Sequence, residues 1–130
     1  MIACRPKANQ IILIRQYRYS LDSDLLELPA GRIEKGEDPF LAAKRELTEE
    51  TGYKAKIWRE LSKMYSAPGF CNELLYVYEA SDVEFVGTNL DEDEEIEVIE
   101  IELSKAWGLV AEGKIQDAKT IAGLGMLVSP

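Results

Sequence analysis

Residues 30–53, which read AGRIEKGEDPFLAAKRELTEETGY, carry the clearest local signals in this chain. The first part of the stretch is rich in glycine and charge and has no apolar periodicity, which predicts a loop. Asp38 can cap a helix, Pro39 suits the first helical position, and Gly52 suits the residue that ends the helix. We therefore predict a loop, a helix over 39–51 and a turn.

Three glutamates of this helix, Glu46, Glu49 and Glu50, are predicted to lie beside an apolar stripe that includes Leu47. At ~100° per residue, the three carboxylates fall within an arc of about 100°. Like charges one turn apart destabilise a helix unless a cation joins them. A hard divalent cation such as Mg²⁺ binds carboxylate oxygens. The pattern favours a metal site over the alternative, a solvated acidic helix in which Arg45 pairs with Glu49.

The absence of histidine narrows the chemistry that this chain can perform. It excludes an imidazole base, a Ser–His or Cys–His couple and a His-ligated zinc ion. Two cysteines, Cys4 and Cys71, are too few for a disulfide framework or a four-thiolate metal site. We expect both to be small, buried or half-buried residues. Catalysis would then depend on carboxylate, hydroxyl and cationic groups and a hard metal ion.

The net charge of −9 comes from 15 Lys and Arg against 24 Asp and Glu, and it is unevenly distributed. Eight acids and no base lie over 91–102, whereas the first twenty residues contain four bases and no acid. An acidic chain repels nucleic acid, so we expect no DNA or RNA partner. A basic edge facing an acid-rich site instead suits a small phosphate-bearing ligand that arrives with a metal ion.

The length of 130 residues fits one domain, here 1–130, with a single core. The longest aliphatic run covers only residues 11–14, far short of the ~20 apolar residues of a membrane span. The first ten residues lack the apolar core of a signal peptide. We therefore expect a cytoplasmic protein without a membrane partner.

Apolar periodicity and turn residues elsewhere predict a layered α/β (α+β) domain. Extended segments are expected at 10–18, 25–28, 53–65, 74–80 and 96–103, and further helices at 104–112, capped by Ser104, and at 117–127. The acidic loop over 82–95 is long for a compact domain, and loops of that length are often functional.

The loop–helix segment resembles the Nudix box, the motif G-x5-E-x7-R-E-U-x-E-E-x-G-U. The matching residues are Gly31, Glu37, Arg45, Glu46, Leu47, Glu49, Glu50 and Gly52. A chance match of the seven fixed positions is on the order of one in 10^8 per window at average residue frequencies. The resemblance implies the Nudix fold, a mixed sheet sandwiched between helices with the box as loop–helix–loop. It also implies hydrolysis of a nucleoside diphosphate linked to another moiety.

Flanking segments resemble the ADP-ribose diphosphatases and related nucleoside-diphosphate-sugar hydrolases. These segments are 16–18 (QYR), 27–31 (ELPAG), Pro68 within 66–70, and 112–120 (EGKIQDAKT). The resemblance implies that a homodimer releases a nucleoside monophosphate and a sugar phosphate. Relatives usually carry a longer N-terminal stretch that swaps between subunits and helps to hold the adenine. The strand predicted over 10–18 lies close to the start of this sequence, which leaves room for a broader sugar-nucleotide specificity.

Carried over by position, the resemblance implies a Mg²⁺ site, with Mn²⁺ as an alternative ion. The ligands would be the Ala30 carbonyl and the carboxylates of Glu46 and Glu50. Glu49 would lie close to these ligands, and it is a candidate both for a metal ligand and for a catalytic residue. Arg45 would brace the box and hold these carboxylates in position.

The resemblance also implies a catalytic base in the acidic loop and substrate-binding residues outside the box. By register, Glu92 is the first choice for the base and Glu94 the second. Arg18 would contact the diphosphate, with Arg15 as a further substrate-binding residue, and Glu73 would contact the sugar.

Three other interpretations stay open. One is a Nudix hydrolase of nucleoside triphosphates or dinucleoside polyphosphates, which shares the box but does not need Pro68 at its place. Another is a non-catalytic Nudix module that senses nucleotides, against which the complete set of box glutamates argues. The third is an acidic calcium- or protein-binding domain, which only the run over 91–102 supports.

Overall fold

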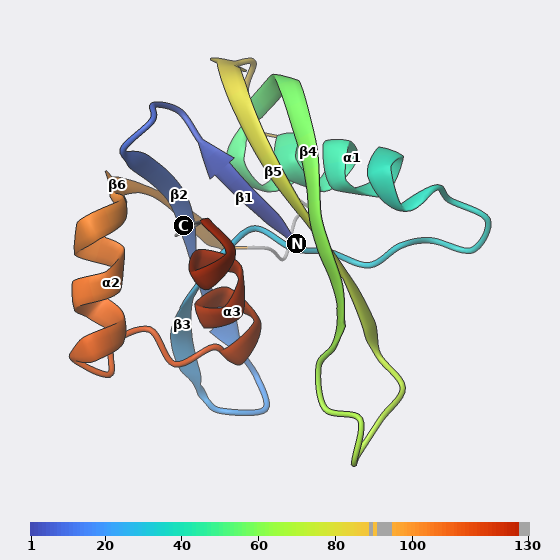
Figure 1. Ribbon diagram of the computed structural model, residues 1–130, viewed down its shortest axis with the longest axis vertical. Coiled ribbons are helices and arrows are strands. Elements are labelled where there is room, and N and C mark those ends of the chain that lie inside the picture. The colour runs from blue at the N-terminus through green and yellow to red at the C-terminus, as the bar shows by residue number, and fades with distance from the viewer. Residues whose placement is uncertain (89, 91–94, 128–130) are drawn as a thin grey trace.

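The computed structural model describes residues 1–88, 90 and 95–127 (Figure 1). Its elements in chain order are β1 (Ile2–Arg5), β2 (Gln10–Arg18), β3 (Ser23–Glu27), α1 (Pro39–Thr51), β4 (Tyr53–Tyr65), β5 (Leu74–Phe85), β6 (Ile96–Glu102), α2 (Leu103–Ala111) and α3 (Ala118–Leu127).

The strands form two three-stranded sheets. One has the order β1-β5-β4, with β1 parallel to β5 and β4 antiparallel to it. The other has the order β3-β2-β6 and is antiparallel throughout. Figure 1 shows α1 on one side of the strands and α2 and α3 on the other. This layered mixture confirms the α+β class and the sandwich that the Nudix resemblance implied.

Alternation along β1 and β2 produces two cores, because successive side chains of a strand point to opposite faces. In β1, Ala3 belongs to the core that packs against α2 and α3, whereas Cys4 belongs to the core beneath α1. In β2, Ile11 and Leu13 belong to the first core and Ile12 to the second. Both faces of these strands are therefore buried, which explains their nearly continuous apolar sequence.

Helix α1 begins and ends as its sequence predicts. Asp38 Oδ1 accepts hydrogen bonds from the backbone N–H groups of Phe40 and Leu41, at 2.9 and 3.1 Å. Gly52 has φ 77°, in the left-handed region that glycine enters without steric cost, and its N–H donates to Thr48 O. Both boundaries of the helix that carries the box glutamates are thus set by local chemistry.

The structure also differs from several sequence expectations. Strand β1 was not predicted, because it is short and is defined by pairing with the distant β5. Strand β5 continues to Phe85, beyond the predicted end at residue 80. The N-cap of α2 is Glu102, so the prediction of Ser104 as the cap is wrong. Cys4 is buried as expected, but Cys71 is exposed. In the described part of the chain, every helix is too short or too polar to cross a membrane.

Candidate active site

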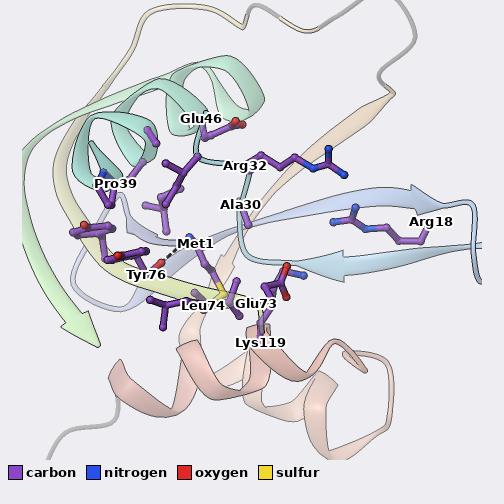
Figure 2. Close-up of a pocket in the computed structure, with 17 residues that line it drawn as sticks. Met1, Arg18, Ala30, Arg32, Pro39, Glu46, Glu73, Leu74, Tyr76 and Lys119 are labelled. Atoms are coloured by element: carbon purple, nitrogen blue, oxygen red, sulfur yellow. Dashed lines mark hydrogen bonds between the residues drawn. The ribbon is translucent and has the colours of Figure 1, made fainter. Parts of the chain in front are cut away.

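A cavity of about 560 Å³ lies between α1, the loop that follows β3, the start of β5 and the start of α3 (Figure 2). Four of the residues expected at the site from the sequence line it, namely Arg18, Ala30, Glu46 and Glu73. These residues come from β2, the loop after β3, α1 and the turn before β5. The fold therefore brings together groups that lie far apart in the sequence.

Gly31 makes room for the carboxylate of Glu46. A Cβ atom built at position 31 would overlap this carboxylate, and the three atoms nearest to it all belong to the Glu46 carboxyl group. One turn along α1, the carboxylate of Glu50 accepts a hydrogen bond from Ala30 N–H at 3.2 Å, and Glu50 as a residue is 6% exposed. Two carboxylates of α1 thus lie against the backbone of the 30–31 loop.

Arg45 connects the loop to the helix through its whole guanidinium group. Its Nε and Nη2 donate to the two carboxylate oxygens of Glu37, both at 2.9 Å. Its Nη1 donates to Glu46 at 2.8 Å and to Glu49 at 3.0 Å. The hydrogen bonds from Arg45, aided by the backbone N–H of Glu34, lower the pKa of Glu37 to about 2. The carboxylate of Glu37 in turn raises the pKa of Arg45, so both groups stay charged at neutral pH.

The three box glutamates do not all face the same space. Glu49 lines a second cavity of about 510 Å³ with Lys54 and Trp58, whereas Glu46 lines the first. On a helix at ~100° per residue, Glu49 lies about 60° from Glu46 on one side and Glu50 about 40° on the other. The arc that the sequence predicts therefore carries side chains that line two different cavities.

A buried acidic centre lies behind the cavity at the end of β3. Glu27 is 1% exposed, and its carboxylate accepts from Arg18 at 2.6 and 2.7 Å and from Lys119 Nζ at 2.7 Å. Burial alone would raise the pKa of Glu27, but the hydrogen bonds from Arg18 and Lys119 hold it below its ordinary value. The Glu27 carboxylate also raises the pKa of Arg18.

Sequence reasoning did not single out Glu27, Lys119 or Arg32 as site residues, although Arg32 and Lys119 line the cavity. Glu27 offers one local signal, because it is a lone acid among the leucines of 25–28. A buried charge of this kind needs a partner. Nothing in its neighbourhood identifies that partner as a lysine 92 residues away in sequence.

The remaining candidates are Arg15 and the acids of the loop over 91–95. Arg15 donates to Glu97 at 2.9 Å on an exposed surface and is not among the described residues that line the cavity. Arg15 and Arg18 are three residues apart in a strand, so their side chains leave opposite faces. Glu92 and Glu94 lie outside the described residues, and Glu95 is exposed.

The groups around Glu46 fit a hard cation in their chemistry. Within the described ranges, no three acidic or thiol side chains are already grouped as a cation site. Mg²⁺ does not require such a cage, because it is usually bound by one or two carboxylates, with water and substrate phosphate oxygens completing the octahedron. Glu46 and Glu50, next to the backbone at Ala30, supply that minimum all-oxygen set.

Comparisons with known proteins found curated relatives that share more than a third of their aligned residues with this chain. The chain is 42% identical over 114 residues to "ADP-ribose pyrophosphatase" of Bacillus subtilis (strain 168), covering 86% of this chain and 62% of the relative. It is 39% identical over 121 residues to "Methanol dehydrogenase activator" of Bacillus methanolicus, covering 92% and 65%. It is 35% identical over 127 residues to "GDP-mannose pyrophosphatase" of Salmonella typhimurium (strain LT2), covering 90% and 65%. The chain thus spans less than two thirds of the length of these curated relatives.

A solved structure and a family assignment complete the comparison. A chain titled "Crystal structure of ADP compounds hydrolase" superposes with a TM-score of 0.88 at 28% identity, covering 98% of this chain and 68% of that chain. The family described as NUDIX domain matches residues 1–124, nearly the whole sequence. The chain therefore belongs to the Nudix domain family, whose hydrolases generally use divalent metal ions.

Proposed function

We propose that this chain is a metal-dependent diphosphatase of ADP-ribose or related nucleoside diphosphate sugars. It would release a nucleoside monophosphate and a sugar phosphate. The observation that carries the proposal is the cavity that Glu46 lines together with the cationic side chains of Arg18, Arg32 and Lys119. A nucleotide diphosphate with its metal ion has the charge pattern that such a cavity accepts. The names of two relatives and of the solved structure support this substrate class.

The chemical problem is to bring a water nucleophile to a diphosphate that repels hydroxide. A bound divalent cation, for which we propose Mg²⁺, neutralises phosphate charge and lowers the pKa of a bound water. We assign Glu46, Glu50 and the Ala30 backbone carbonyl to hold this ion. Arg45 keeps the carboxylate of Glu46 in position through the hydrogen bond at 2.8 Å.

In the reaction, the water oxygen attacks one phosphorus, the bridging P–O bond breaks, and no covalent enzyme intermediate forms. The proton of the attacking water passes to a carboxylate of the acidic loop, for which we keep Glu92 and then Glu94 as candidates. Arg18 contacts the diphosphate, and Glu73 accepts a hydrogen bond from a sugar hydroxyl. Each of these roles is a proposal that follows from the family resemblance, and the lining of the cavity supports those of Arg18 and Glu73.

Glu50→Gln tests the metal assignment. An amide oxygen can still accept from Ala30 N–H, so we expect the fold to persist while most metal-dependent turnover is lost. The assay is product release from ADP-ribose, GDP-mannose, UDP-glucose and dGTP with Mg²⁺ or Mn²⁺. Glu112→Gln is the matched control, because Glu112 pairs with Lys114 on the surface. Near-normal turnover by Glu50→Gln would refute the assignment, and a clear preference for dGTP would transfer the protein to the triphosphate hydrolases.

We further propose that the protein works as a homodimer in the cytoplasm and without a nucleic-acid partner. The resemblance supports the dimer, and the net charge of −9 supports the lack of a nucleic-acid partner. Light scattering coupled to size-exclusion chromatography measures the mass directly. A monomer at micromolar concentration would remove the dimer from the proposal.

A further inference from the structure

Lys119 is held at the wall of the cavity by two carboxylates from different elements. Its Nζ donates to Glu27 at 2.7 Å and to the two oxygens of Asp117 at 2.9 and 3.0 Å. Asp117 is itself fixed, since its Oδ2 accepts from the N–H and the hydroxyl of Thr120. The hydroxyl of Thr120 in turn accepts from Leu28 N–H. This network fixes the start of α3 to the end of β3, and it fixes the ammonium group with it.

Lys119 lies across the cavity from Glu46, the residue that we propose holds the metal ion. Figure 2 shows Glu46 and Lys119 on opposite sides, with Ala30 and Met1 between them. The side chain of Lys119 is 20% exposed, so it keeps an open side, whereas Glu27 is 1% exposed behind it. An ammonium group has three donors, and a ligand oxygen can replace one of the two Asp117 oxygens as an acceptor. The carboxylates of Glu27 and Asp117 thus hold the ammonium group of Lys119 at the wall of the cavity, where a ligand can still contact it.

The positive charge of Lys119 favours binding of an anionic ligand in the cavity. Among the described residues that line the cavity, the cationic side chains are Arg18, Arg32 and Lys119. A nucleotide sugar carries negative charge on both phosphates. A divalent ion held by Glu46 would offset charge at that end of the cavity only. A phosphate at the other end needs a cation of the protein, and Arg18 and Lys119 share the same buried carboxylate there.

We propose that Lys119 is a substrate-binding residue that contacts the diphosphate from the side opposite Glu46, and that Glu27 is its positioning residue. The proposal rests on the proposed function, since it names how the same cavity binds its nucleotide sugar. It adds a residue of the C-terminal helix to a site otherwise built from the box and the strands. Helix α3, which packs into the core through Leu124, would therefore also contribute to ligand affinity.

The experiment measures binding of ADP-ribose by isothermal titration calorimetry in EDTA, where no metal contributes and no turnover occurs. Loss of a hydrogen bond from a charged donor predicts that Lys119→Gln binds about ten- to hundred-fold more weakly than the wild type. With Mg²⁺, kcat/KM should fall by a similar factor, and Lys119→Arg should recover part of the loss. Lys114→Gln is the control, because Lys114 is 64% exposed and pairs only with the surface residue Glu112 among the described ion pairs.

A second variant keeps the proposal falsifiable if Lys119→Gln does not fold. Asp117→Asn/Lys119→Gln removes the lysine together with Asp117, whose carboxylate pairs with Lys119 alone among the described ion pairs, while Glu27 keeps its two hydrogen bonds from Arg18. It should fold and bind ADP-ribose as weakly as the single variant. Equal affinities in the wild type and in the folded variants, or no binding by the wild type, would overturn the inference and leave Lys119 a structural role. Wild-type binding without hydrolysis would instead reject the proposed function and leave the ratio of affinities to judge Lys119.

Discussion

Gly31→Ala should separate the stability of this protein from its activity. The backbone at position 31 is not in the left-handed region, so alanine meets no conformational penalty there. The atoms nearest to the new Cβ belong to the flexible end of the Glu46 side chain. The fold can therefore accept the methyl group, but only if the carboxylate of Glu46 moves.

The size of this movement follows from the overlap. Real Cβ atoms essentially never approach other heavy atoms within 3.0 Å, so the carboxylate must retreat by roughly 1 Å. A misplacement of roughly 1 Å at a catalytic site can cost about 100-fold in rate. Alanine also lowers the entropy of the unfolded chain, which stabilises a protein by about 0.4–1 kcal/mol where its conformation fits. We therefore expect a loss of about 100-fold in kcat/KM with a change in unfolding free energy below about 1 kcal/mol.

The assay pairs metal-dependent hydrolysis of ADP-ribose with urea unfolding. Gly69→Ala is the matched control, because a Cβ at Gly69 meets nothing within 4 Å. Gly31→Ala/Glu46→Ala should be no less active than Glu46→Ala alone, since both changes act through one carboxylate. Full activity of Gly31→Ala, or additive losses in the double variant, would refute this reasoning.

Three further predictions concern charge and burial. Arg45→Lys replaces a forked donor by a single ammonium group, so the free energy of unfolding in urea should fall by about 1–2 kcal/mol, and an unchanged value would contradict this. Glu27 and Glu37 have lowered pKa values, so their stabilisation is complete above the ordinary value of 4.5 and is lost as pH falls, toward about 2 for Glu37. The unfolding free energy should therefore fall from about pH 5 to about pH 2, and less steeply in Glu37→Gln. In the folded protein an alkylating reagent should modify the exposed Cys71 and spare the buried Cys4. Burial, aided by Glu100, raises the pKa of the Cys4 thiol to about 12, so little reactive thiolate forms there. Mass spectrometry that shows both thiols modified before unfolding would contradict the burial of Cys4.

Local sequence was sufficient where short-range chemistry sets the structure. The cap at Asp38, the left-handed Gly52 and the arc of box glutamates follow from neighbours within one or two helical turns. These interactions depend on spacing along the chain, and a regular helix converts spacing into direction. The resemblance to the Nudix family rests on the same local segment, and for that reason the fold and the family could be predicted together.

Only the tertiary structure decided which distant groups meet. Lys119 pairs with Glu27 across 92 residues, Arg15 points away from the cavity that Arg18 lines, and β1 finds its parallel partner in β5. Such pairings arise from competition among many charged or apolar partners of similar energy, and the packing of helices on both faces of the strands selects among them. The chain by itself therefore determined the box helix and its three carboxylates. The folded molecule determined which of these carboxylates face the cavity and which cations lie opposite them.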